Sequence, residues 1–295
     1  MHQLIGIDIG GTRIKMSVFS SDGTMLAQRT GETGDRPTAG VPAFAETARR
    51  MLREVDAQEA CVGIAAPGVA AKDGRSIACQ PGKMYGIEGF DWGAFLERDV
   101  PVLNDAHAAL LGEVWQGAAK GATDAILLTL GTGVGGAILS DGRLMKGSFG
   151  RAGHLGHVSV TEDDQRSIFG TPGSLEAAVG NYTVGARSSG RFSSTREVVE
   201  AHCEGDAQAS AIWEKSLRIL ARAIASFINI LDPEIVIIGG GITKAGPILF
   251  EPLARYLDEI EWRPAGRRVG IVPAALGEWA GAYGAAWNAR KLASI

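Results

Sequence analysis

Two glycine-rich turns occupy matching places in the two halves of this chain, and they constrain its fold more than any other feature. Each turn joins two apolar runs, and each second run ends in a Ser-Asp-Gly turn. The turns are Asp8-Ile9-Gly10-Gly11-Thr12 and Leu130-Gly131-Thr132-Gly133-Val134-Gly135-Gly136. We interpret them as a duplicated hairpin of strand, glycine turn and strand. Because glycine lets the backbone come close and turn its N–H groups toward an anion, the two turns could grip the phosphates of one nucleotide.

Length and composition exclude several classes of protein. A chain of 295 residues favours two domains that share a cleft, and 45% hydrophobic with 21% charged residues is typical of a globular protein. The net charge of -4 and the lack of a clustered basic tract argue against nucleic-acid binding. No apolar run is long enough for a membrane span, and no basic segment precedes the first one as in a secretory signal. We therefore expect a cytoplasmic protein whose scattered thiols, Cys61, Cys79 and Cys203, stay reduced.

The order of apolar patterns predicts an α/β protein. Expected strands lie at about 3–9, 13–20, 24–30, 60–65, 101–103 and 234–238, besides those of the second hairpin. Expected helices lie at about 40–55, 105–115, 207–231 and 277–292. The helix over 207–231 is the clearest, because its apolar residues recur at helical spacing until Asp232-Pro233 ends it.

Asp8 ends a strand that we expect to be buried, which is costly for a carboxylate without a cation or donors. An Mg²⁺ ion bound through water and carrying nucleotide phosphates would meet that need. The alternative is an ordinary hairpin turn, as most Gly-Gly pairs are. Lys15 on the next strand could assist with phosphate or be an ordinary surface lysine.

The segment Gly131–Gly136 contains a match to G-x-G-x-x-G, but a strand follows it, not the helix that a Rossmann phosphate site requires. The hairpin interpretation is therefore favoured. Asn104-Asp105, at the end of a short strand, could be a helix cap. In a cleft opposite a triphosphate, Asp105 would be the general base for a hydroxyl nucleophile.

Three further segments each allow two interpretations. His154 and His157 form either a polar loop or half of a metal site, although no further ligands lie at convincing spacing. Glu176 is either an acid in the first turn of a helix or an acceptor for sugar hydroxyls. Gly239-Gly240-Gly241 either ends a strand or lets adenine approach the backbone.

Taken together, these residues resemble the ROK family of sugar kinases, in the actin-like, ribonuclease-H-like superfamily. The resemblance covers nearly the whole chain and rests on the segments Asp8–Thr12, Asn104-Asp105, Leu128–Gly136, Ala152–His157, Gly173–Glu176 and Asp232–Gly241. It implies a two-domain α/β fold of the actin-like ATPase type, with a cleft between domains. We expect a smaller domain over residues 1–115, a larger one over 116–283, and a C-terminal helix over 284–295 that packs back on the first domain.

The resemblance also implies roles for particular residues. One phosphate loop would comprise Gly10, Gly11 and Thr12, and the other Gly131, Thr132 and Gly133. Gly239 and Gly240 would line the adenosine pocket, and Asp105 would be the base. The sugar would be contacted by Asn104, His157 and Glu176, with the loop at Pro67-Gly68 closing on it.

Three departures from the family pattern affect the prediction. His154 stands where the family usually has a glutamate, so an imidazole replaces a carboxylate among the sugar contacts. The cysteines of the family's zinc motif are replaced by Ser167, Phe169 and Ser174, and we predict no structural zinc. Gln80-Pro81-Gly82 replaces a segment where relatives often carry an asparagine beside the sugar.

These observations predict ATP- and Mg²⁺-dependent phosphorylation of a hexose, at the C6 hydroxyl of glucose or of a related sugar, by a homodimer. The alternatives are a sugar-responsive regulator and a catalytically weak binding protein of the same family. A regulator is expected to carry a DNA-binding segment before Asp8, where there is no room for one. Asp105 and both phosphate loops, in turn, favour an active enzyme.

Overall fold

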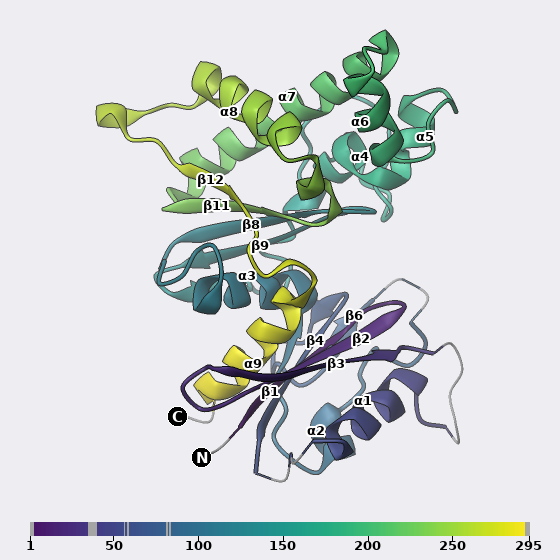
Figure 1. Cartoon of the computed structure of the whole chain (residues 1–295), viewed down its shortest axis with the longest axis vertical. Coiled ribbons are helices and arrows are strands. Elements are labelled where there is room, and N and C mark those ends of the chain that lie inside the picture. Colours follow the sequence, from purple (N-terminus) through teal and green to yellow (C-terminus); the bar gives the residue numbers. More distant parts are fainter. Residues whose placement is uncertain are drawn as a thin grey trace. The chain divides into compact units, whose positions relative to one another are not determined.

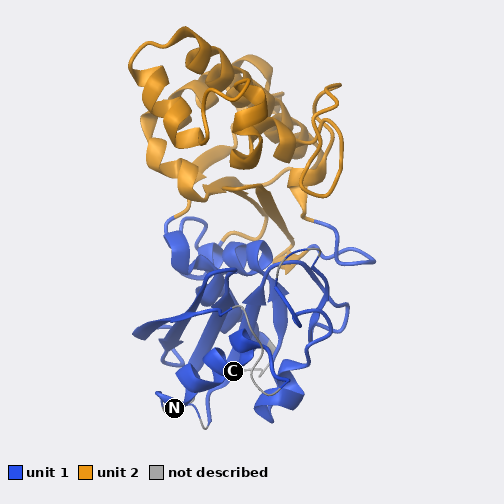
Figure 2. Cartoon of the chain, turned by 90° about the vertical axis from the view of Figure 1, so that its right-hand side faces the viewer, with its two compact units in different colours: residues 1–121, 145–152, 275–295 blue, residues 122–144, 153–274 orange. Residues whose placement is uncertain are grey.

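The computed structural model describes residues 3–34, 40–55, 57, 59–80, 82 and 84–292. The chain divides into two units: unit 1 holds residues 1–121, 145–152 and 275–295, and unit 2 holds residues 122–144 and 153–274 (Figure 2). The sequence analysis placed the domain boundaries after residues 115 and 283, which are not the limits of these two units. The domain boundaries therefore remain a prediction. Pro81, which belongs to one of the departures noted above, lies outside the described residues, as do the last three residues of the expected C-terminal helix.

The central sheet of unit 1 has the strand order β3-β2-β1-β4-β7. Its hairpins β1/β2 and β2/β3 are antiparallel, whereas β1/β4 and β4/β7 are parallel. The strands are β1 (Leu4–Ile9), β2 (Arg13–Phe19), β3 (Met25–Glu32), β4 (Cys61–Ala66) and β7 (Val102–Asn104). A small antiparallel pair, β5 (Val69–Ala70) and β6 (Ile77–Cys79), lies outside this sheet.

Unit 2 repeats the same sheet with the order β10-β9-β8-β11-β12. Again two antiparallel pairs come first and two parallel pairs follow. The strands are β8 (Ala125–Leu130), β9 (Val134–Ser140), β10 (Arg143–Leu144), β11 (Ile235–Gly239) and β12 (Gly270–Pro273). The predicted duplication of the hairpin is therefore confirmed, and it extends to the whole sheet.

The two faces of the first sheet differ because side chains alternate along a strand. On β1, the buried Ile5, Ile7 and Ile9 belong to a core that includes Phe44 of α1 (Ala43–Arg53) and Trp92 of α2 (Trp92–Leu96). The other face is covered by α3 (Asp105–Gln116) and α9 (Ala280–Leu292) (Figure 1). Asp8 lies on this second face, between the strand and the first turn of α9.

Glycines allow α9 to pack closely against β1, β4 and α3. A Cβ atom at Gly6 would overlap the Ala282 carbonyl oxygen, and one at Gly63 would overlap that of Ala285. A Cβ atom at Gly284 would likewise overlap the carbonyl oxygen of Ala108 on α3. The Gly/Ala-rich composition of this helix follows from these backbone contacts. Its predicted start at residue 277 is three residues too early, because Gly277–Trp279 forms a 3₁₀ turn.

The core of unit 2 is built around α7 (Ala207–Leu231), whose predicted bounds are confirmed. Asp206 caps its first turn by accepting a hydrogen bond from Ala209 N, and Asp232 ends it in the left-handed conformation, at φ 43°. The apolar stripe predicted from spacing is buried except for the partly buried Leu231: Trp213, Leu217, Leu220, Ile224 and Phe227. Burial of each such side chain contributes about 1.5–3 kcal/mol to folding.

The sequence analysis gave no bounds for the other described helices of unit 2, although one interpretation of Glu176 placed it in the first turn of a helix, where it lies. They are α4 (Leu175–Val179), α5 (Val184–Arg187), α6 (Thr195–Cys203) and α8 (Pro247–Ile260), with 3₁₀ turns η1 (Leu155–His157), η2 (Asn181–Thr183), η3 (Gly241–Ala245) and η4 (Pro264–Gly266). None of the described helices combines the length and the apolar composition that a membrane crossing needs.

Candidate functional site

The first glycine turn joins β1 to β2 and is held from both sides. Gly10 N donates to Arg13 O at 2.9 Å, and a Cβ atom at Gly10 would lie 2.7 Å from that same oxygen. Thr33, just after β3, donates its hydroxyl to Gly10 O at 2.6 Å and its amide to Thr12 O at 3.1 Å. Gly11 and Thr12 are exposed. The turn is therefore a fixed backbone loop whose outer edge is open to a ligand.

Asp8 lies at the end of β1, opposite Lys15 of β2. A Cβ atom at Gly281 of α9 would lie 2.8 Å from the carboxyl carbon of Asp8, so the helix passes directly over this group. Burial and the nearby negative charge of Asp105 raise the pKa of Asp8 to about 7, while the Lys15 ammonium lowers it. Lys15 itself lies 3.6 Å from the carboxylate of Glu278. Its predicted role in phosphate binding stays a prediction.

Asn104 and Asp105 lie where β7 passes into α3. Asn104 is buried and caps the helix, because its Oδ1 accepts hydrogen bonds from Ala106 N at 3.0 Å and His107 N at 3.1 Å. Its Nδ2 donates to Gly68 O at 2.8 Å and to Asp105 Oδ1 at 2.9 Å. The side-chain amide is thus already used to position the Gly68 loop and Asp105. Its direct contact with a sugar, which the resemblance implies, is not tested by these contacts.

The two carboxylate oxygens of Asp105 differ. Oδ1 accepts hydrogen bonds from Asn104 Nδ2 and, at 2.8 Å, from Ala106 N, whereas none of the described residues donates to Oδ2. Desolvation by the protein around this end of α3 raises the pKa of Asp105, and the two hydrogen bonds lower it. One oxygen is therefore held for orientation while the other is available to accept a proton.

The Asp8 carboxylate fits a divalent cation bound through water. It is an oxygen donor, which Mg²⁺ prefers, and a bound cation would relieve both the cost of its burial and the repulsion from Asp105. In the described part of the chain, no group of three or more His, Cys, Asp or Glu side chains is arranged to hold a metal ion.

The second glycine turn joins β8 to β9 and is supported by a buried carboxylate. Glu176 on α4 accepts hydrogen bonds from Val134 N at 3.0 Å and from Ile168 N at 3.2 Å. A Cβ atom at Gly133 would overlap its Oε2 atom, so a larger residue there requires this carboxylate to move. Both carboxylate oxygens hold backbone, and the predicted contact of Glu176 with a sugar stays a prediction.

Backbone contacts from η2 complete the support of this turn. Asn181 N donates to Gly131 O and Tyr182 N to Thr132 O, both at 3.0 Å. Gly131 and Thr132 are exposed, as are Gly11 and Thr12 in the first turn. The two predicted phosphate loops therefore share one design, a rigid hairpin turn with an open edge.

His154 precedes the turn η1, which packs on β9, and His157 is the last residue of that turn. Their rings are nearly parallel, with centroids 6.4 Å apart, and His157 also contacts the ring of Phe169 at 5.4 Å. In the segment that replaces the zinc motif, the Ser167 hydroxyl accepts hydrogen bonds from Phe169 N and Thr171 N. The Ser174 hydroxyl caps α4 by accepting from Ala177 N at 3.1 Å. Hydrogen bonds thus organise this loop.

A cavity of about 690 Å³ opens within unit 2 beside the second glycine turn. Gly131, Thr132 and Gly241 contribute to its wall, whereas Gly239 and Gly240, which were predicted to line the adenosine pocket, are not among its lining residues. Gly240 has φ 88°, and a Cβ atom there would overlap the Leu130 carbonyl oxygen. Its size and its largely apolar wall suit a nucleoside. The other lining residues are Leu130, Val179, Asn181, Thr195, Arg196, Val199, Glu200, Ile242, Lys244 and Ala245.

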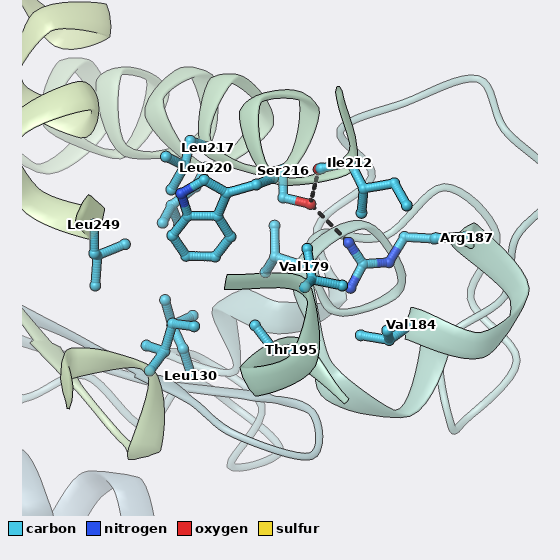
Figure 3. Close-up of a pocket in the computed structure, with 13 residues that line it drawn as sticks. Leu130, Val179, Val184, Arg187, Thr195, Ile212, Ser216, Leu217, Leu220 and Leu249 are labelled. Carbon is cyan, nitrogen blue, oxygen red and sulfur yellow. Dashed lines mark hydrogen bonds between the residues drawn. The ribbon is translucent and has the colours of Figure 1, made fainter. Parts of the chain in front are cut away.

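A smaller cavity of about 20 Å³ shares the wall formed by Leu130, Val179 and Thr195 (Figure 3). Arg187 points toward Ser216 here and donates to its hydroxyl at 2.7 Å. Burial lowers the pKa of Arg187 to about 10. The side chain therefore stays charged near neutral pH and is held by neutral acceptors, including Gly180 O at 2.9 Å.

Several residues that organise the site were missed by the sequence analysis. Thr33 supports the first turn, and the buried His107 contacts Ala152 O through Nε2 at 3.1 Å. Glu113, fully buried on α3, accepts hydrogen bonds from Ala118 N, Ala275 N and Leu276 N. No local pattern predicts these residues, because all of their partners named here except Ala118 lie far away in the sequence.

Comparison with known proteins gives one consistent family. The ROK family profile matches residues 4–292. The glucokinase of Thermotoga maritima is 34% identical over 96% of both chains, and the N-acetylmannosamine kinase of Escherichia fergusonii is 31% identical over 96% of both.

A solved structure agrees with this assignment. The ROK glucokinase of Streptomyces griseus, in complex with glucose and AMPPNP, is 27% identical over 98% of this chain and 99% of that one, with a TM-score of 0.76. The predicted actin-like α/β fold and the family resemblance are thereby confirmed. The chain belongs to the ROK family.

Proposed function

We propose that this protein is an ATP-dependent hexose kinase that phosphorylates the C6 hydroxyl of glucose or of a closely related hexose. The observation that carries the proposal is the state of Asp105. One of its oxygens is fixed by Asn104 Nδ2 and Ala106 N, and the other is available to a substrate. The names of the relatives, glucokinase and N-acetylmannosamine kinase, support the substrate class.

In the proposed reaction, Asp105 Oδ2 accepts the proton of the attacking sugar hydroxyl. The hydroxyl oxygen forms a bond to the γ-phosphorus of ATP as the bond to the β–γ bridging oxygen breaks, and ADP leaves. The N–H groups of Gly10–Thr12 and Gly131–Gly133 donate to phosphate oxygens. Asp8 would hold Mg²⁺ through water, and the ion would supply positive charge against the charge of the transferring group.

Unit 2 would bind the nucleoside of ATP in its cavity of about 690 Å³, next to Gly131 and Thr132. His154, His157 and Glu176 would contribute to sugar recognition, with the Gly68 loop. Because His154 replaces the family's usual glutamate, N-acetylmannosamine and other hexoses belong in the same test as glucose.

The test is ADP release measured over a panel of hexoses and N-acetylated hexoses, with ATP and Mg²⁺. We expect turnover with at least one sugar and none after Mg²⁺ removal. Sugar binding by calorimetry without ADP release would contradict the proposal and favour the alternative of a regulator or weak binding protein.

Asp105→Asn is the decisive variant, with an expected loss of turnover of ~10²–10⁴-fold and unchanged nucleotide binding. Asp91→Asn is its matched control, because Asp91 also caps a helix of unit 1, by accepting from Ala94 N at 3.0 Å. Wild-type turnover in Asp105→Asn would remove Asp105 from the role of base.

We also propose that the enzyme needs no structural zinc and acts as a cytoplasmic homodimer. The hydroxyls of Ser167 and Ser174, at positions of the zinc motif, accept backbone hydrogen bonds. Activity should therefore be unchanged after treatment with a zinc-selective chelator. Light scattering of the purified protein tests the dimer.

A further inference from the structure

We propose that His107 is a positioning residue for sugar binding: it anchors the segment Met145–Ala152, from which the chain enters the His154–His157 segment. The inference rests on the proposed function, since it assumes that His154 and His157 contact the sugar. It adds a residue that neither the sequence motifs nor the comparisons single out.

The imidazole of His107 makes a defined contact. Its Nε2 atom lies 3.1 Å from Ala152 O, and the residue is 2% exposed. Because a carbonyl oxygen only accepts hydrogen bonds, Nε2 carries the proton and donates. The backbone N–H of His107 is bound in turn by Asn104 Oδ1 at 3.1 Å. The Asn104 cap therefore fixes the first turn of α3. The imidazole of His107, which belongs to this turn, in turn holds Ala152 through its hydrogen bond.

The segment Met145–Ala152 is closed on itself and held at a second point. Ala152 N donates to Lys146 O at 3.3 Å. Gly150, at φ 78°, lies against β5, where a Cβ atom would be 2.8 Å from Ala70 O. β5 directly follows Gly68, whose carbonyl accepts from Asn104 Nδ2. The contacts of Ala152 and of Gly150 therefore both connect the segment to the start of α3, the helix that carries Asp105.

The contact between His107 and Ala152 matters because of where the segment Met145–Ala152 lies in the chain. Residues 145–152 belong to unit 1, although unit 2 contains the residues on either side of them. His154 is two residues after Ala152, so loss of the anchor frees the backbone that leads directly into the predicted sugar contacts. Loss of a buried hydrogen bond of this kind corresponds to about a fivefold to tenfold change in an equilibrium constant.

The experiment compares His107→Phe with His107→Gln. Phenylalanine keeps the volume but has no donor, whereas the glutamine Nε2 can donate from nearly the same place. For His107→Phe we expect the KM for the preferred sugar to rise about fivefold to tenfold, with the KM for ATP within twofold of wild type. His107→Gln should restore most of the sugar KM.

Hydrogen exchange gives a second readout that does not depend on activity. Amides of residues 145–157 should exchange about tenfold faster in His107→Phe than in wild type, and at the wild-type rate in His107→Gln. Gly150→Ala, which disturbs the second anchor, should also raise the sugar KM. His202→Phe is the matched control, because His202 hydrogen-bonds Ser210 Oγ at 2.9 Å in unit 2. It should change neither readout.

Unchanged exchange in His107→Phe would overturn the inference, whatever the activity. So would equal increases of the KM values for sugar and ATP, or failure of His107→Gln to restore the sugar KM. If the wild-type protein phosphorylates no hexose, the proposed function fails, and exchange still decides whether His107 anchors the segment.

Discussion

The two glycine turns stand on matching hairpins, yet different chemistry supports them. In unit 1, Asp8 lies two residues before Gly10, and a neutral hydroxyl, that of Thr33, holds the turn. In unit 2, Thr129 lies two residues before Gly131, and a buried carboxylate, that of Glu176, holds the turn. None of the described donors binds the carboxylate beside the first turn, whereas backbone N–H groups bind the carboxylate beside the second.

This difference indicates a division of labour after duplication. The repeated sheet provides two equivalent backbone loops, and we infer that one changed position in each hairpin decides what the loop can bind. A carboxylate without hydrogen-bond donors suits a cation, whereas a loop whose neighbouring carboxylate is already bound by N–H groups can accept an anion. The following predictions test this comparison, from the largest expected effect to the smallest.

The largest difference is expected between the equivalent positions 8 and 129. Asp8→Asn should lower kcat/KM by ~10²–10³-fold, because the carboxylate that holds Mg²⁺ is lost. Thr129→Val, the matched change in unit 2, should stay within about threefold of wild type, since no charge is removed. Steady-state kinetics over a range of Mg²⁺ concentrations measures both. Equal losses in the two variants would mean that the turns do not differ in this way.

Alanine substitutions in the two glycine turns should lower the free energy of unfolding by different amounts. Gly133→Ala places a methyl group on the Glu176 carboxylate and should lower the free energy of unfolding by about 3 kcal/mol. Nothing lies within 4 Å of a Cβ atom at Gly11, so Gly11→Ala should change it by less than about 0.5 kcal/mol. Urea unfolding followed by circular dichroism is the measurement. A stable Gly133→Ala would show that Glu176 can move away.

Asp8 should also make the stability of the nucleotide-free protein depend on pH. Its pKa rises from an ordinary value of 3.8 to about 7 on folding, so the folded state binds the proton more tightly. The penalty for ionisation therefore grows as the pH rises from about 4 to about 7, and then stays constant. Relative to wild type, Asp8→Asn should gain about 2–3 kcal/mol of stability between pH 5 and pH 8. Thr129→Val should show no such change, and a pH-independent difference for Asp8→Asn would contradict the raised pKa.

The smallest effect is expected at the hydroxyl that holds the first turn. Thr33→Val removes the hydrogen bond to Gly10 O and should cost about 1 kcal/mol of unfolding free energy. Glu176→Gln, the corresponding change at the second turn, should cost more, about 2 kcal/mol. Its amide group would face a backbone N–H that now meets a carboxylate oxygen. Thermal melting of both variants measures the two losses of stability. A larger loss in Thr33→Val than in Glu176→Gln would contradict this prediction.

Much of the fold was predictable because its signals are local. The hairpins follow from apolar runs around glycine pairs, and α7 follows from a helical period that Asp232-Pro233 ends. Asn104-Asp105 at a strand end correctly predicted the start of α3. The contribution of Met145–Ala152 to unit 1 was not predictable, since it depends on contacts with residues about forty to eighty positions earlier in the chain.

The sequence by itself determined which backbone loops exist and which chemical groups stand beside them, because turn geometry and strand alternation depend on neighbouring residues. Tertiary structure alone decided how those groups are used. Glu176 reaches Val134 N, and Asn104 reaches Gly68 O, only after distant segments have packed together. A side chain of one kind can hold backbone or bind a ligand. Which of the two it does depends on the partners that folding brings within hydrogen-bonding distance.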